Sequence, residues 1–139
     1  MISKAKKILV ENGCTCVVIK GEFCFESKQR GVKPLLALID EERNVCGGVA
    51  ADKVIGKAAA FLYILLGIKE IYADVISEPA IELLHKSGIS VEYGERVPMI
   101  RNRDGSGFCP MEQATLMVED EKIALEVIRE TLRSLTKNN

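Results

Sequence analysis

The chain has 139 residues, of which 47% are apolar and 28% are charged, and its formal net charge at pH 7 is −1. This length is typical of one domain, here spanning residues 1–139, and the apolar content is sufficient for a folded core. The near-balance of 19 basic and 20 acidic residues argues against a nucleic-acid or membrane partner, because such binders present a basic face.

Hydrophobic periodicity and turn residues predict an alternation of helices and strands. In chain order we expect a helix capped by Ser3 and ended by Gly13, strands over 14–19 and 22–26, helices over 34–40 and from Asp52 to Leu66, a strand over 70–76, a helix over 77–87, strands over 89–93 and 97–100, a helix that starts at Cys109, and a last helix over 121–136. Residues 70–93 should form a right-handed parallel crossover. The pattern predicts a three-layer α/β domain.

The cysteines and the apolar segments indicate the compartment. The five cysteines are an odd number without a CxxC pair, so neither a disulfide framework nor a structural zinc site is indicated. The longest apolar run, residues 58–68, is shorter than the roughly 20 residues that cross a bilayer. No apolar segment of a signal peptide follows the basic N-terminal residues. We therefore expect a cytoplasmic protein.

The segment Ile-Ser-Glu-Pro-Ala-Ile-Glu-Leu at residues 76–83 resembles a signature of the zinc-dependent cytidine deaminase superfamily, in which a strand runs into (T/S)-x-E-P-C-x-x-C. The order of elements over residues 2–100 is similar to that fold. The resemblance implies a cytidine deaminase-like fold with a mixed five-stranded sheet flanked by helices. Within the superfamily the chain most resembles a small prokaryotic family known only as a domain of unknown function, and the segments 52–60, 77–80, 102–105 and 109–112 look shared.

Departures from this signature remove the metal ligands. A zinc deaminase needs three protein ligands, an open position for water and a glutamate that shuttles protons. Here Lys57 stands at the first ligand position with alanine at the glutamate position, and Ala80 and Leu83 stand at the two cysteine positions. The only histidine, His85, lies toward the far end of its expected helix. We therefore expect no metal, no cofactor and no zinc-dependent deamination.

In the fold that the resemblance implies, the helices starting near Asp52 and Ser77 point their N-termini at one crevice. Free N–H groups and helix dipoles make such a place attractive to anions, and Lys57 would add a positive charge. We expect a small anionic, nucleotide-like ligand there. Alternatively, Lys57 extends to the surface or pairs with Asp52 or Glu78, as lysines commonly do.

Cys109 is a second candidate. A thiol at a helix N-terminus can have a lowered pKa and so be reactive, and the nearby Arg101 and Arg103 would favour the thiolate. Glu112 is the obvious local base for a nucleophilic mechanism. Alternatively, Cys109 caps its helix or packs under Phe108.

Three classes of function remain open at this stage. The first, which we favour, is metal-free binding of the anionic ligand, with the candidate ligand-binding residues Asp52, Lys57, Ser77, Glu78, Ala80, Arg101, Asn102, Arg103 and Cys109. The second is an enzyme of another reaction type, with Lys57, Cys109 and Glu112 as candidate catalytic residues. The third is a structural module with a vestigial pocket that assembles as a homo-oligomer.

Overall fold

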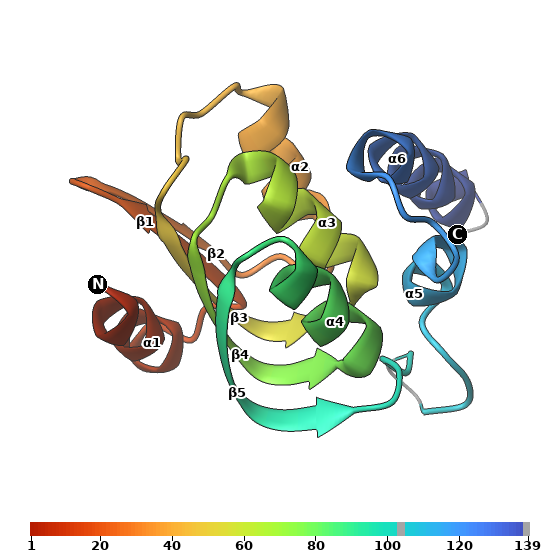
Figure 1. The fold of residues 1–139 in the computed structure, drawn as a ribbon, viewed down its shortest axis with the longest axis horizontal. Helices are drawn as coiled ribbons and strands as arrows, with labels where there is room; N and C mark the ends of the chain where they lie inside the picture. Colours follow the sequence, from red (N-terminus) through yellow and green to blue (C-terminus); the bar gives the residue numbers. More distant parts are fainter. Residues whose placement is uncertain (103–104, 138–139) are drawn as a thin grey trace.

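The computed structural model describes residues 1–102 and 105–137 (Figure 1). The elements in chain order are α1 (Ile2–Glu11), β1 (Cys16–Lys20), β2 (Phe23–Ser27), α2 (Lys33–Asp40), β3 (Val49–Ile55), α3 (Lys57–Leu66), β4 (Glu70–Ser77), α4 (Glu78–Lys86), β5 (Ser90–Val97), α5 (Pro110–Thr115) and α6 (Glu121–Lys137). The expected class, an α/β domain with a mixed five-stranded sheet flanked by helices, is confirmed.

The sheet has the strand order β2-β1-β3-β4-β5. The hairpin partners β1 and β2 are antiparallel, and β1 is also antiparallel to β3. The strands β3, β4 and β5 are parallel, so the crossover expected over residues 70–93 is present as β4-α4-β5. Gly21 turns the hairpin with a φ of +58°, a conformation that glycine adopts without strain.

Helices cover the sheet on both faces, giving three layers (Figure 1). On one face, α1 buries Ala5 and Leu9 against β1 and β3. On the other face lie α2, α3 and α4, and α3 is buried on nearly all sides, with Phe61 and Leu62 fully enclosed. This agrees with its apolar sequence. The helices α5 and α6 pack on α3 from outside. The largest part of the core therefore surrounds α3.

The central strand β3 was not predicted, which corrects the expected helix from Asp52 to Leu66. Residues 49–55 are a strand between β1 and β4, and the helix begins only at Lys57, with Gly56 as its N-cap. Asp52 is therefore a strand residue and not a helix cap. A central strand is covered on both faces, so it lacks the alternation of polar and apolar residues that indicates a half-buried strand.

Two further expectations need correction. The predicted strand over 97–100 does not form; instead β5 continues through Gly94 to Val97. Gly94 allows this because a Cβ there would lie 3.0 Å from the carbonyl oxygen of Asp74 on β4. The first helix begins at Ile2, so Ser3 lies within its first turn and does not cap it. No described helix combines the length and the apolar character that a membrane span requires.

Candidate functional site

A pocket of about 640 Å³ opens at the C-terminal end of β3, and we call it the α3 pocket. Residues from the first turns of three helices, α2, α3 and α5, contribute to its wall, and α6 closes one side. Apolar side chains make up much of this wall, among them Val32, Val54, Ile100, Met111 and Leu132. A volume of this size falls within the roughly 300–1,000 Å³ range of small-molecule sites.

Asp52 lines the α3 pocket from β3, directly opposite Cys16 in the register of β1 and β3. Its side chain faces α3, and the residue is only 8% exposed. The carboxylate oxygen Oδ1 accepts a hydrogen bond from the Val54 amide at 3.2 Å, and Oδ2 accepts one from the Tyr63 hydroxyl at 2.7 Å. The Cys16 sulfur lies 3.4 Å from the same hydroxyl. These residues form a connected polar cluster at the pocket wall.

Burial dominates the ionisation of this cluster. Loss of water raises the pKa of Asp52 to about 7, and the hydrogen bonds from Tyr63 and the backbone offset this only in part. Burial also holds the pKa values of Tyr63 and Cys16 well above their ordinary values. Asp52 is therefore the member of the cluster that titrates near neutral pH.

Glu112 connects the starts of two helices. This residue is 1% exposed, and its Oε1 accepts hydrogen bonds from the Lys57 amide at 2.7 Å and from the Ser77 hydroxyl at 3.3 Å. Its Oε2 accepts one from the Ile100 amide at 2.8 Å. Ser77 is the N-cap of α4, and its hydroxyl oxygen accepts a hydrogen bond from the Ala80 amide. The starts of α3 and α4 therefore meet, as expected, with a carboxylate of the chain itself between them.

The start of α3 retains donors that this carboxylate does not use. No side chain caps the helix from its N-cap position. Within residues 1–102 and 105–137 no group accepts a hydrogen bond from the amides of Ala58 and Ala59, and both residues line the α3 pocket. Such amides carry the positive end of the helix dipole. This part of the wall therefore favours a hydrogen-bond acceptor or an anion.

Exposed cationic side chains among the described residues also line the α3 pocket: Arg30, Lys33, Lys53 and Arg101. None of them forms an ion pair with any acidic residue in the described part of the chain. Arg101 instead lies over the ring of Phe108, at 5.2 Å from its centroid. Among the described residues that line the pocket, Asp52 and Glu112 are the only acidic side chains, so this part of the lining carries an excess of positive charge.

Lys57 and Glu78 do not line this pocket. The ammonium group of Lys57 donates a hydrogen bond of 2.6 Å to the carbonyl oxygen of Leu116, so its partner is neither Asp52 nor Glu78. Partial burial lowers its pKa. Glu78 is exposed and pairs with Arg96 at 3.2 Å. Lys57 therefore takes part in the junction of α3 and α4 through its backbone amide and not through its side chain.

The loop and thiol candidates lie closer to the pocket. Cys109 is half-buried at the N-cap of α5 and lines the α3 pocket, as does Asn102. The Asn102 side chain is held within its own loop, where its oxygen accepts a hydrogen bond from the Gly107 amide at 3.2 Å. Arg103 lies outside the described residues. Both oxygens of Glu112, expected as a base for Cys109, accept hydrogen bonds elsewhere.

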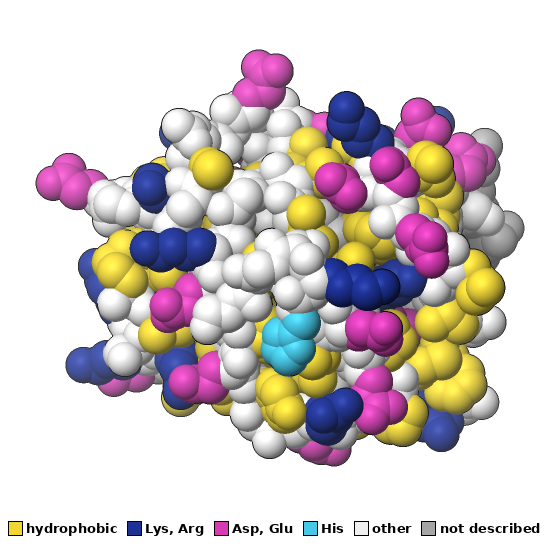
Figure 2. Space-filling view, viewed as in Figure 1, with side chains coloured by type: hydrophobic (Ala, Val, Ile, Leu, Met, Phe, Trp, Pro, Cys, Tyr) yellow, Lys and Arg dark blue, Asp and Glu magenta, His cyan; other side chains and the backbone are white. Residues whose placement is uncertain are grey.

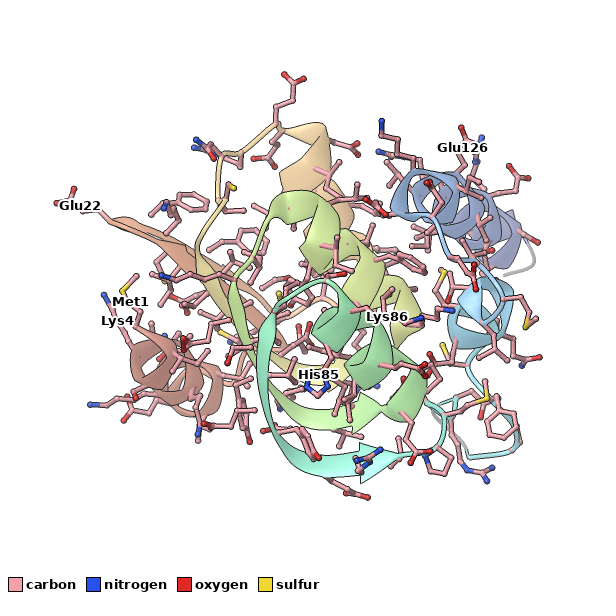
Figure 3. All side chains as sticks on the ribbon, in the orientation of Figure 1. Met1, Lys4, Glu22, His85, Lys86 and Glu126 are labelled. Carbon is pink, nitrogen blue, oxygen red and sulfur yellow. The ribbon has the colours of Figure 1, made fainter. Side chains whose placement is uncertain are left out.

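Among residues 1–102 and 105–137, no three His, Cys, Asp or Glu side chains are placed to hold a metal ion together. His85 lies exposed in the last turn of α4, at the molecular surface (Figures 2 and 3). Figure 2 also shows acidic and basic side chains interspersed on the face in view.

Comparison with known proteins places the chain in a family. The model of a domain of unknown function, DUF1893, matches residues 4–132. The chain belongs to the DUF1893 family. A DUF1893 protein of Thermotoga maritima, known from a crystal structure, is 34% identical with a TM-score of 0.83, covering 95% of this chain and 88% of that one. The expected membership of a family of unknown function is thereby confirmed.

The DUF1893 chain also matches a second solved structure in part. This is a diaminohydroxyphosphoribosylaminopyrimidine deaminase/5-amino-6-(5-phosphoribosylamino)uracil reductase of Thermotoga maritima, with 18% identity and a TM-score of 0.42. The match covers 82% of this chain and 38% of that protein. The search of curated proteins gave no match.

Several residues of the α3 pocket in this DUF1893 protein were missed from the sequence. Cys16, Arg30 and Lys33 line the pocket but were not among the candidate residues, and neither was Tyr63, whose hydroxyl donates to Asp52 at the pocket wall. One signal was available: a tyrosine in an otherwise apolar helix needs a hydrogen-bond partner for its hydroxyl group when it is buried. That requirement points from Tyr63 to a nearby polar residue such as Asp52.

Proposed function

We propose that this DUF1893 protein binds a small anionic, nucleotide-like ligand in the α3 pocket, without a metal ion and without deaminating it. The observation that supports this most directly is the set of cationic side chains around the pocket, which have no acidic partner among the described residues. Cations at a pocket rim attract a phosphate or carboxylate group of a ligand. The apolar wall suits the flat face of a heterocycle.

The helix starts support the same proposal. Ala58 and Ala59, whose amides have no acceptor among the described residues, line the pocket, and Lys33 is the first residue of α2, whose start also lies in the wall. Helix N-termini favour negative charge. Glu112 and Ser77 already occupy the junction of α3 with α4. We therefore place the ligand at the starts of α3 and α2 and not between α3 and α4.

Deamination is not part of the proposal. Lys57, Ala80 and Leu83 stand where the deaminase signature has its zinc ligands, and alanine and leucine side chains have no atom that ligates a metal. The Lys57 side chain is directed to the Leu116 carbonyl. Binding should consequently be insensitive to a chelator such as EDTA.

Isothermal titration calorimetry with 5′-mononucleotides and the corresponding nucleosides tests this function. We expect at least one nucleotide to bind about tenfold or more tightly than its nucleoside, because the phosphate gains charge-assisted hydrogen bonds. The double variant Arg30→Gln, Lys33→Gln should lose this preference. The control Arg43→Gln, which removes an arginine over the Phe23 ring outside the pocket, should keep it. Equal affinity for nucleotides and nucleosides, or no binding of either, would contradict the proposal.

A further inference from the structure

Asp52 is a buried acceptor that its neighbours satisfy only in part. A carboxylate has about four acceptor positions on its two oxygens. The Val54 amide uses one position on Oδ1 and the Tyr63 hydroxyl uses one on Oδ2. The Lys53 amide also lies near the carboxylate and lowers its pKa, but it donates to the Thr15 carbonyl oxygen at 3.0 Å. The proton of the Tyr63 hydroxyl is used on Asp52, so the thiol of Cys16 donates to the tyrosine oxygen. The remaining lone pairs of Asp52 belong to a side chain that lines the pocket.

Backbone hydrogen-bond donors lie on the side of α3 from which Tyr63 reaches Asp52. Tyr63 follows Ala59 by one helical turn, so both residues are on one face of the helix. The amides of Ala58 and Ala59 have no acceptor among the described residues. The pocket wall therefore offers a pair of acceptor oxygens beside a pair of backbone donors. A ligand that satisfies both needs two N–H groups next to one carbonyl oxygen.

We infer that the ligand carries a guanine-type edge, with its two N–H groups on the Asp52 carboxylate and its carbonyl oxygen at the amides of Ala58 and Ala59. This inference rests on the proposed function and names the base that the anionic ligand carries. Guanine presents N1–H and an exocyclic amino group as neighbouring donors, and its O6 oxygen lies beside them. Two parallel N–H···O bonds to a carboxylate are a strong, directional arrangement.

The other bases match this wall less well. Adenine and cytosine place an acceptor nitrogen beside their amino group, and that lone pair would face the Asp52 carboxylate. Uracil has one N–H group between two carbonyl oxygens, with the same consequence. Hypoxanthine keeps the N–H group and the carbonyl oxygen of guanine but lacks the exocyclic amino group. Hypoxanthine is therefore the matched control base, because it removes one hydrogen bond without adding a repulsive contact.

The test compares guanosine 5′-monophosphate with inosine 5′-monophosphate by isothermal titration calorimetry at pH 8. We expect guanosine monophosphate to bind about tenfold or more tightly, because one hydrogen bond to a charged group is lost with inosine. In Asp52→Asn the ratio of the two affinities should fall toward one, since an amide offers one acceptor where the carboxylate has two. Asp74→Asn is the matched control: it removes a carboxylate from the neighbouring strand β4, outside the pocket.

The outcomes separate this inference from the proposed function. Equal affinities of the two nucleotides in the native chain, or tighter binding of the adenosine or cytidine nucleotide, would overturn the guanine assignment. The preference for nucleotides over nucleosides would still support anion binding in that case. If Asp52→Asn keeps the native ratio, the guanine edge does not contact this carboxylate and the inference is wrong. If no nucleotide binds the native chain, both fail together.

Discussion

Asp52 should make the domain less stable as the pH rises, and the substitution Asp52→Asn isolates this effect. The folded chain holds the pKa of Asp52 at about 7, whereas an aspartate in an unfolded chain titrates near ~3.9. Between these two values the folded state keeps a proton that the unfolded state has released. The free energy of unfolding therefore falls with increasing pH in this window, and little further change comes from Asp52 above pH 7.

The size of the effect follows from the two pKa values. Each pH unit below the folded pKa contributes about 1.4 kcal/mol, so from pH 5 to pH 8 the native chain should lose about 2.5 kcal/mol relative to Asp52→Asn. Urea denaturation of both chains at the two pH values measures this difference. Other titrating groups, including the neighbouring Tyr63, Cys16 and Asp74, are present in both chains, so their contributions largely cancel.

Asp74→Asn is the control for this experiment, because it removes a neighbouring charge and leaves the buried carboxyl in place. Its stability should follow the native pH dependence closely. If the curves of the native chain and Asp52→Asn run parallel from pH 5 to pH 8 within about 0.5 kcal/mol, which is near the error of such extrapolations, Asp52 has an ordinary pKa in the folded state. The reasoning from its burial would then be refuted.

Three further predictions concern the remaining candidates. Glu112→Gln should lower the free energy of unfolding by about 2–3 kcal/mol in urea denaturation. The glutamine side chain has one acceptor oxygen, whereas Glu112 uses one oxygen for the Lys57 backbone N–H and the other for that of Ile100. A loss below about 0.5 kcal/mol would contradict this prediction. Lys57→Met should leave nucleotide affinity within about twofold in calorimetry, since its ammonium group lies outside the pocket, and a tenfold loss would place it in the site. Iodoacetamide should label Cys109 in the folded chain, and bound nucleotide should slow this labelling. Cys16 is 3% exposed and has a raised pKa, so it should react only after unfolding. Mass spectrometry of the labelled peptides measures both rates, and equal labelling rates of Cys109 and Cys16 in the folded chain would contradict this prediction.

The elements that were predicted correctly have strong local signals. The glycine-containing link at residues 20–21 predicted the hairpin of β1 and β2, and Ser77 with Pro79 predicted the start of α4. In the structure the Ser77 hydroxyl oxygen accepts a hydrogen bond from the Ala80 amide. These signals depend on residues that are close together in the chain, so they can be recognised without knowing how distant segments pair.

The strand β3 lacked a comparable signal. Gly47 and Gly48 followed by Asp52 are typical of a turn and a helix cap, and the alanines between them have low strand propensity. What makes residues 49–55 a strand is their position between β1 and β4, where residues 49–52 are buried. That pairing is a long-range property. Misplacing this strand also misplaced Asp52, whose partner Cys16 is far away in the sequence but directly opposite in the sheet.

The site was predictable only in outline for the same reason. The convergence of the starts of α3 and α4 followed from the family resemblance. The occupant of that junction did not, because Glu112 lies on a short helix far along the chain and was assigned as a local base. Lys33 and Arg30 were missed because exposed cations are common on any surface. Only the folded chain brings them to the same pocket as Asp52.

The position of Glu112 determines which helix start remains for a ligand. Two helix N-termini that meet carry like partial charges and unsatisfied amides, so an anion between them is stabilising. Glu112 supplies this anion for the Lys57 amide of α3 and the Ser77 cap of α4. Its second oxygen binds the Ile100 amide and so fixes α5 and the preceding loop against α3. The carboxylate accepts only from the first amide of α3. The amides of Ala58 and Ala59 have no acceptor within residues 1–102 and 105–137, and both residues line the pocket, so this is where the chain retains capacity for an acceptor from outside.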